Sequence, residues 1–112
     1  GSAATLAEAK RRDAASRQTL AREILGGLTV VGDPRAYHLW LALPETWRAE
    51  AFAAAALRRG IALLPAAAFA VHPGHAPNAV RLALATPSPE DLSEALTTLR
   101  RLALSEDDQI VE

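Results

Sequence analysis

The chain contains no cysteine, which excludes disulfides and thiolate metal sites and suits a reducing compartment. No apolar run approaches the roughly 20 residues that span a bilayer, and nothing near the N-terminus reads as a signal peptide. With a formal net charge of −1, the chain has no overall field to attract nucleic acid or an anionic membrane. We therefore expect a cytoplasmic protein with no membrane partner.

Methionine is also absent, even at the start, and Gly1-Ser2 is typical of what tag cleavage leaves behind. We therefore expect a piece of a longer parent, with residues 1–2 as a tag remnant, 3–104 as one domain and 105–112 as a flexible acidic tail. The single lysine, Lys10, lies among arginines near the start of a predicted helix. A Schiff-base lysine needs a buried pocket, so we expect no catalytic residue, no bound cofactor and no enzyme activity in this chain alone.

Helices and strands alternate along the 112 residues. Helix signals cover residues 5–25, opened by a capping box at Thr5-Leu6-Ala7-Glu8, then 47–59, and a last helix capped by Ser88-Pro89. Short apolar or alternating segments predict strands at residues 28–31, 37–43, 61–64 and 80–85. The pattern predicts an α+β domain, with a small, mainly antiparallel sheet whose leucine face is covered by helices.

The other face of that sheet carries His38, Trp40 and Arg81. A charged residue inside a strand is either solvated or paired, so Arg81 is a surface arginine or a rigid carboxylate-binding group. His72 and His75 lie in a Pro/Gly loop without further ligands nearby, and we expect no metal site.

Three segments resemble MocR-type regulators, a branch of the GntR family: residues 37–44 with the Trp47 helix after them, residues 59–71, and residues 77–84 before a proline-started helix. The resemblance covers about residues 13–103. It implies an N-terminal winged helix-turn-helix DNA-binding domain fused to a fold-type I aminotransferase domain that binds pyridoxal phosphate. The cofactor's lysine, its aspartate and most phosphate contacts would lie in the large domain, which has no counterpart here.

The resemblance also implies that this small domain supplies one functional group. In the family, the arginine of an Asn-x-x-Arg-Leu strand binds the α-carboxylate of an amino-acid ligand, and that pattern falls on Asn78 and Arg81. Members often carry glycine directly after the proline of Pro-Gly-x-x-Phe, whereas this chain has Pro65-Ala66-Ala67-Ala68-Phe69, so the resemblance does not give the path of that loop.

The sequence leaves two alternatives to a MocR-type regulator. A true aminotransferase would have much the same small domain as a regulator, and the element order also permits a free-standing ferredoxin-like binding or assembly module. The implied partners are the large domain, an amino-acid-type ligand, DNA through the N-terminal domain, and a second copy in a homodimer. An apolar sheet face around Trp40 and Ala42 also predicts self-association of the isolated chain.

Overall fold

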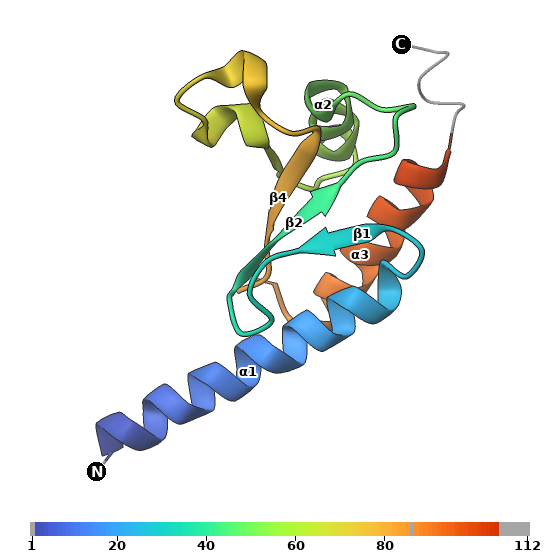
Figure 1. Ribbon diagram of the computed structural model, residues 1–112. Helices are drawn as coiled ribbons and strands as arrows, with labels where there is room; N and C mark the ends of the chain where they lie inside the picture. Colours follow the sequence, from blue (N-terminus) through green and yellow to red (C-terminus); the bar gives the residue numbers. More distant parts are fainter. Residues whose placement is uncertain (1, 86, 106–112) are drawn as a thin grey trace.

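The computed structural model describes residues 2–85 and 87–105, and the predicted tail therefore lies outside the described residues from 106 onward (Figure 1). Within these residues, three α-helices, four strands and two short 3₁₀ helices follow one another. Their order is α1 (Ser2–Ile24), β1 (Thr29–Val31), β2 (His38–Ala42), α2 (Ala49–Arg58), β3 (Leu64–Pro65), η1 (Ala66–Phe69), η2 (Pro73–His75), β4 (Ala79–Ala83) and α3 (Pro89–Leu104).

The four strands form one antiparallel sheet in the order β1-β2-β4-β3. In the central pair, Trp40 lies opposite Arg81 and Leu39 lies opposite Leu82. Because side chains alternate along a strand, this register puts the leucines on one face and Trp40 with Arg81 on the other. The predicted α+β class and the predicted division of the two faces are confirmed.

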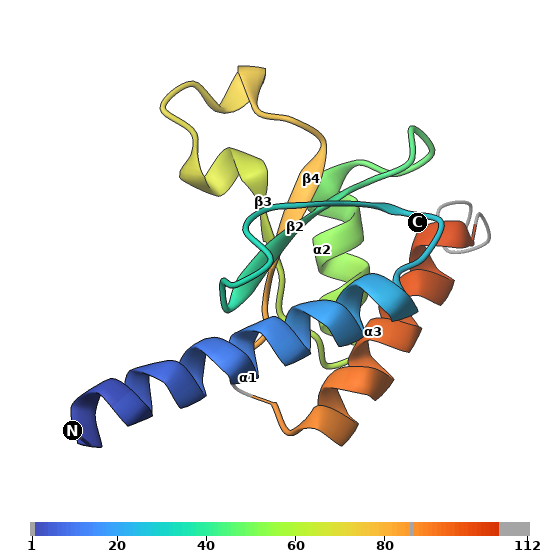
Figure 2. The same ribbon diagram turned by 60° about the horizontal axis from the view of Figure 1, so that its bottom comes forward.

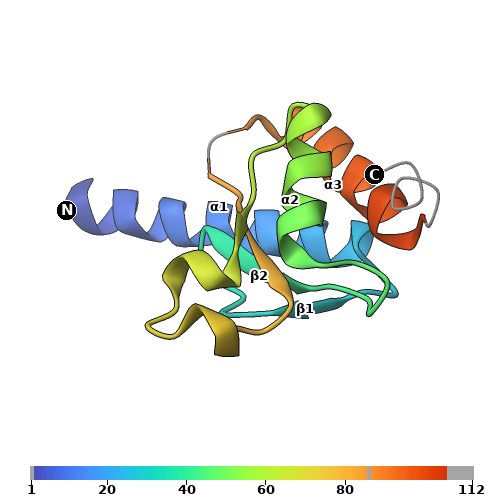
Figure 3. The ribbon, with the colours of Figure 1, turned by 90° about the horizontal axis from the view of Figure 1, so that it is seen from above.

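The core lies between the leucine face and the helices. Figure 3 shows the helices on one side of the sheet and the segment with η1 and η2 on the other. Trp47 and Phe52 are fully buried in this core, with their rings edge to face at 5.4 Å. The Trp47 indole N–H also donates to the Leu102 carbonyl oxygen at 3.1 Å, which ties the end of α3 to the core.

Helix α1 begins earlier than the sequence predicts. It starts at Ser2, so Thr5 and Glu8 lie inside the helix and the predicted capping box is wrong as a helix start. Ala3 and Ala4 favour the helical state as strongly as the residues after them, and nothing stops the helix before Thr5. The first half of α1 projects past the sheet, and the second half packs beside α3 (Figures 1 and 2).

The start of α2 differs from the prediction by two residues. The sequence predicts that Trp47 is helical, but its backbone N–H closes a turn to the Pro44 carbonyl oxygen at 3.0 Å. Arg48 is extended and gives the helix no side-chain cap, so α2 begins at Ala49.

The predicted strand over residues 61–64 is also shorter than expected. The Ile61 N–H bonds to the Ala56 carbonyl at 2.9 Å and completes the exit from α2 through Gly60, whose φ is +80°. The strand β3 therefore consists only of Leu64 and Pro65. Proline fits there because β3 is an edge strand, where the missing N–H of proline interrupts no hydrogen bonds between strands.

The start of α3 agrees with the sequence. The Ser88 hydroxyl accepts a hydrogen bond from the Asp91 N–H at 3.2 Å, and Pro89 is the first helical residue.

Candidate functional site

The sheet face opposite the three α-helices is the candidate site, and we call it the bare face. It consists of His38, Trp40 and Ala42 from β2 with Ala79, Arg81 and Ala83 from β4. Arg81 is at its centre, because β4 lies between β2 and β3 and Arg81 pairs with Trp40 on one side and Leu64 on the other. Strands on both sides fix the Arg81 backbone, so only its side chain can move.

The Arg81 guanidinium makes no hydrogen bond and no ion pair with any residue in the described part of the chain. It borders a groove of about 580 Å³ whose lining includes no acidic side chain. We call this the arginine groove; it is lined by Tyr37, His38, Ala62, Leu63, Leu64, Phe69, Arg81 and Ala83. Five guanidinium N–H groups that lack a protein acceptor can bind a carboxylate through two parallel bonds.

Two aromatic rings lie beside Arg81 on the bare face. The Phe69 ring comes from η1, and the Arg81 Cζ atom lies over it, 5.0 Å from its centroid. The Trp40 ring meets Phe69 edge to face at 5.5 Å. These rings border a second, apolar hollow of about 430 Å³ on the same face. The sequence offered no periodic signal for this contact, because η1 reaches the sheet from a loop.

Asn78, which the sequence placed beside Arg81 in one motif, has a different set of contacts. Its side-chain oxygen accepts the Ala49 N–H at 2.8 Å, and its side-chain nitrogen donates to the Trp47 carbonyl at 2.6 Å. Its backbone carbonyl accepts the Leu43 N–H at 2.9 Å. The amide therefore caps α2, the helix that lacks a cap of its own, and fixes the start of the strand that carries Arg81.

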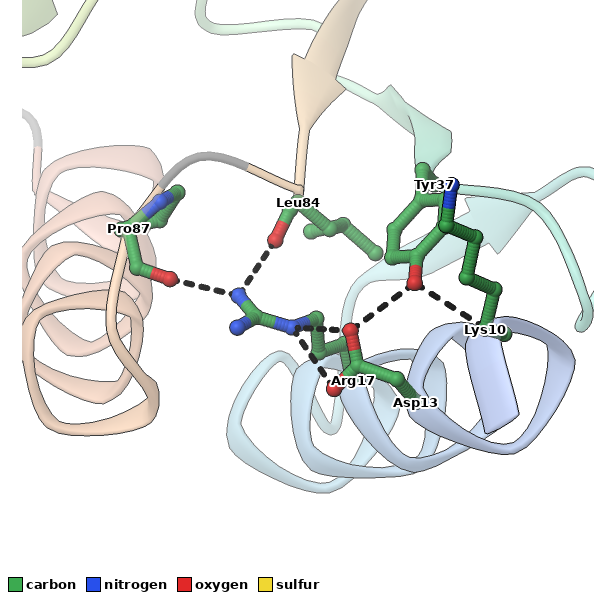
Figure 4. Close-up of polar contacts among 6 residues, drawn as sticks. All are labelled: Lys10, Asp13, Arg17, Tyr37, Leu84 and Pro87. Atoms are coloured by element: carbon green, nitrogen blue, oxygen red, sulfur yellow. Dashed lines mark hydrogen bonds and ion pairs between the residues drawn. The ribbon is translucent and has the colours of Figure 1, made fainter. Parts of the chain in front are cut away.

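A polar cluster joins α1 to the far end of the same sheet (Figure 4). An Arg17 terminal nitrogen donates to the carbonyl oxygens of Leu84 and Pro87 at 2.7 and 2.6 Å. Its Nε lies 3.2 Å from both carboxylate oxygens of Asp13, and the Tyr37 hydroxyl lies 2.9 Å from one of them. The cluster thus ties the exit of β4 and the entry to β2 to one helix.

The hydrogen bonds of this cluster shift the pKa values of two of its residues. The hydrogen bond from Tyr37 lowers the pKa of Asp13, and the Arg17 guanidinium adds to this effect in spite of some desolvation. The same bond to a carboxylate raises the pKa of Tyr37. The Asp13 carboxylate and the Arg17 guanidinium therefore hold the joint between α1 and the sheet.

The remaining sequence candidates lie elsewhere. Lys10 is exposed on α1, and its carbonyl oxygen is 3.0 Å from the Tyr37 hydroxyl. His72 and His75 have ring centroids 6.2 Å apart. Within the residues that the structure describes, no three His, Asp or Glu side chains form a group that could hold a metal ion. Across the same residues, none of the helices has the length and apolar character needed to cross a bilayer.

The fold is a small α+β domain in which α-helices cover one sheet face and the other face carries Arg81. Residues 2–99 match the family model described as aminotransferase class I and II. The chain belongs to this family. The family match favours an aminotransferase-like domain over a free-standing ferredoxin-like module. A search of curated proteins found no significant match.

Solved aminotransferases have similar structures. A probable N-succinyldiaminopimelate aminotransferase from Thermus thermophilus is 33% identical, with a TM-score of 0.63, over 82% of this chain and 23% of that chain. LysN, an α-aminoadipate aminotransferase from a second strain of Thermus thermophilus, is 21% identical, with a TM-score of 0.69, over 91% of this chain and 26% of that one. An archaeal alanine:glyoxylate aminotransferase is 21% identical, with a TM-score of 0.69, over 83% and 23%. The chain thus spans about a quarter of the length of these structures.

Proposed function

We propose that this domain supplies the carboxylate-binding group, Arg81, of an amino-acid site that a pyridoxal-phosphate-binding large domain completes. Both domains would belong to one longer protein, which we call the parent. The observation that supports this proposal best is the Arg81 guanidinium itself. It is mounted on a central strand, faces away from the helices and meets no acceptor among the described residues.

The charge around Arg81 also favours an anionic ligand. No carboxylate lines the arginine groove, so a ligand carboxylate has no internal competitor. The groove walls are largely apolar, and water is a weaker screen there than on an open surface. A bidentate guanidinium–carboxylate pair in this setting selects amino acids or 2-keto acids over ligands that lack the acid group.

The cofactor is assigned to the large domain. When bound, pyridoxal phosphate acts as an electron sink for reactions at the α-carbon of an amino acid. The residues of this chain do not fit it, because the only lysine is exposed on α1 and a Schiff-base lysine needs a buried pocket. The role of this domain is to bind and orient the ligand.

We further propose that the parent is a MocR-type transcriptional regulator of the GntR family. The support is the resemblance in residues 37–44, 59–71 and 77–84. Such a parent would bind DNA through an N-terminal winged helix-turn-helix domain and act as a homodimer. The absence of cysteine supports a cytoplasmic location for it.

Substitution of Arg81 in the parent tests the carboxylate site. Loss of a charged, bidentate hydrogen-bonded pair costs about 1.5–3 kcal/mol, so Arg81→Ala should weaken amino-acid binding roughly 10- to 100-fold. The matched control is Arg101→Ala, which removes an exposed arginine from α3 on the opposite side of the sheet. Calorimetric titration with a panel of amino acids gives the affinities. Equal affinities in the Arg81 variant and the wild type would refute the proposal.

The regulator assignment has its own test. In gel-shift assays with the parent's upstream DNA, an amino-acid effector should change operator binding in the wild type but not in the Arg81→Ala protein. A parent that binds no DNA and converts amino acids to keto acids would be an aminotransferase, and the regulator assignment would be wrong while the Arg81 assignment stood.

A further inference from the structure

The contact between Phe69 and Arg81 is not explained by packing alone. Phe69 is 46% exposed, so it gains less from burial than a core aromatic residue does. Its ring nevertheless lies against two groups of the bare face, with the Trp40 ring at 5.5 Å and the Arg81 Cζ at 5.0 Å. An aromatic ring within about 6 Å of a guanidinium attracts it through the ring quadrupole.

We propose that Phe69 is a positioning residue that holds the Arg81 guanidinium in its carboxylate-binding orientation. This inference rests on the proposed function of Arg81. Arginine has a long, flexible side chain, and freezing it on ligand binding costs conformational entropy. A side chain already held by Phe69 has less freedom to lose, so the ligand carboxylate binds more tightly.

The geometry allows both contacts at once. A ring attracts a guanidinium through its flat face, whereas a carboxylate binds the N–H groups at the guanidinium edge. Phe69 therefore does not compete with the ligand. An acidic residue at the same place would hold Arg81 equally well but would occupy the N–H groups that the ligand needs.

The neighbouring structure holds Phe69 in place. Pro65 pairs with β4 in the sheet, and the buried Ala66 begins η1 directly after it. The Ala70 N–H bonds to the Ala67 carbonyl at 3.4 Å and closes the turn around Phe69. The Trp40 ring, edge to face with Phe69 at 5.5 Å, adds a second contact to the ring.

The test compares an amino acid with its carboxamide, which lacks the charge that Arg81 would bind. For the parent, the ratio of the amide Kd to the acid Kd measures the carboxylate-specific part of affinity. Phe69→Leu keeps an apolar side chain but removes the ring, and it should lower this ratio roughly 3- to 10-fold. Phe69→Tyr keeps the ring face and should leave the ratio within about twofold of the wild type. A residue that only packs would change both affinities together and leave the ratio alone.

The Arg81→Ala variant separates the two proposals. If it leaves the ratio unchanged, Arg81 binds no carboxylate and both proposals fail. If it lowers the ratio but Phe69→Leu does not, the Phe69 inference alone is overturned. In an Arg81→Ala background, Phe69→Leu should have no further effect on the ratio, because the two residues act on one interaction.

An independent readout uses the present chain and no ligand. Relaxation of the Arg81 Nε–H resonance should report a more mobile side chain in Phe69→Leu than in the wild type, with Phe69→Tyr close to the wild type. Equal mobility in all three proteins would overturn the inference. Circular dichroism spectra that match the wild type would establish that each variant is folded.

Discussion

Asn78 and Arg81 lie in one sequence motif, and the structure gives them opposite energetic roles. Asn78→Ala removes an acceptor for the Ala49 N–H at 2.8 Å and a donor to the Trp47 carbonyl at 2.6 Å. Each bond contributes about 1 kcal/mol net, and loss of a helix cap costs about 0.5–2 kcal/mol. Asn78 is accessible to water, which can replace part of both bonds. We therefore expect a loss of about 2 kcal/mol in the free energy of unfolding.

Arg81→Ala should behave differently in the same assay. The guanidinium has no protein acceptor among the described residues, so its removal breaks no hydrogen bond and loses the cation–π contact with Phe69. A cation–π contact at an exposed site is worth about 0.5–1 kcal/mol. Arg81→Ala should thus change stability by no more than that amount. Asn78→Asp keeps the oxygen that caps α2 but loses the nitrogen, so it should fall between Asn78→Ala and the wild type.

Urea unfolding followed by circular dichroism measures these differences. With a slope of about 2 kcal/mol per molar urea, Asn78→Ala should lower the midpoint by about 1 M. The Arg81 variant should stay within roughly half that shift. An Asn78→Ala midpoint equal to the wild type would refute the view that this amide caps α2. A larger loss in Arg81→Ala than in Asn78→Ala would mean that Arg81 serves the fold and would weaken its assignment to a ligand.

Two further predictions concern the core and the α1 joint. Trp47→Phe removes the indole N–H that bonds to Leu102 at 3.1 Å and leaves space in a filled core, so it should cost about 1–3 kcal/mol of unfolding free energy in the same urea assay. The lowered pKa of Asp13 means that its charged form stabilises the folded state. This contribution to the free energy of unfolding is present above the ordinary pKa of about 3.9 and is lost as the pH falls through the pKa of Asp13 in the folded protein. Because the pKa of Tyr37 is raised, its contribution is present below about 10 and is lost as the pH rises through the folded value. Tyr37→Phe should raise the Asp13 pKa measured by carboxyl NMR. It should also weaken the dependence of the free energy of unfolding on pH at both the acidic and the alkaline end. An unchanged Asp13 pKa would contradict the hydrogen bond.

The sequence predicts those parts of the fold that local chemistry determines. Alternation over residues 37–43 is enough to predict β2 and to place Leu39 on the core face. Ser88 and Pro89 predict the start of α3 because the cap acts within one turn. The same period of two puts Arg81 on the uncovered face, so its position could be predicted before its role.

Contacts between segments that are far apart in the sequence produce no local sequence pattern from which they could be predicted. Gln18 is 1% exposed, and its amide donates to the carbonyls of Ala36 and His38 at 2.8 and 2.9 Å. From the sequence, a polar residue in a weakly amphipathic helix is expected to face solvent. The acceptors of Gln18 are backbone carbonyls of a loop and a strand, and no sequence pattern identifies them. The amide of Asn78 belongs to the same class, because the helix that it caps begins 29 residues earlier.

The core and the bare face differ in how fully their polar and apolar groups are in contact with other groups of the chain. Among the described residues, every buried side-chain nitrogen and oxygen has a hydrogen-bond partner, and the exposed large apolar side chains of the helices are Leu6, Leu57 and Leu104, one on each helix. Four exposed large apolar side chains belong to β1, β3 and the segment after β3: Val31, Leu64, Phe69 and Val71. Arg81 lies among these segments with its N–H groups unused. A surface that combines uncovered apolar area with an unpaired cation is poorly suited to water and well suited to a partner that brings both apolar cover and a carboxylate. In the proposed parent, a large domain with a bound amino acid would supply both.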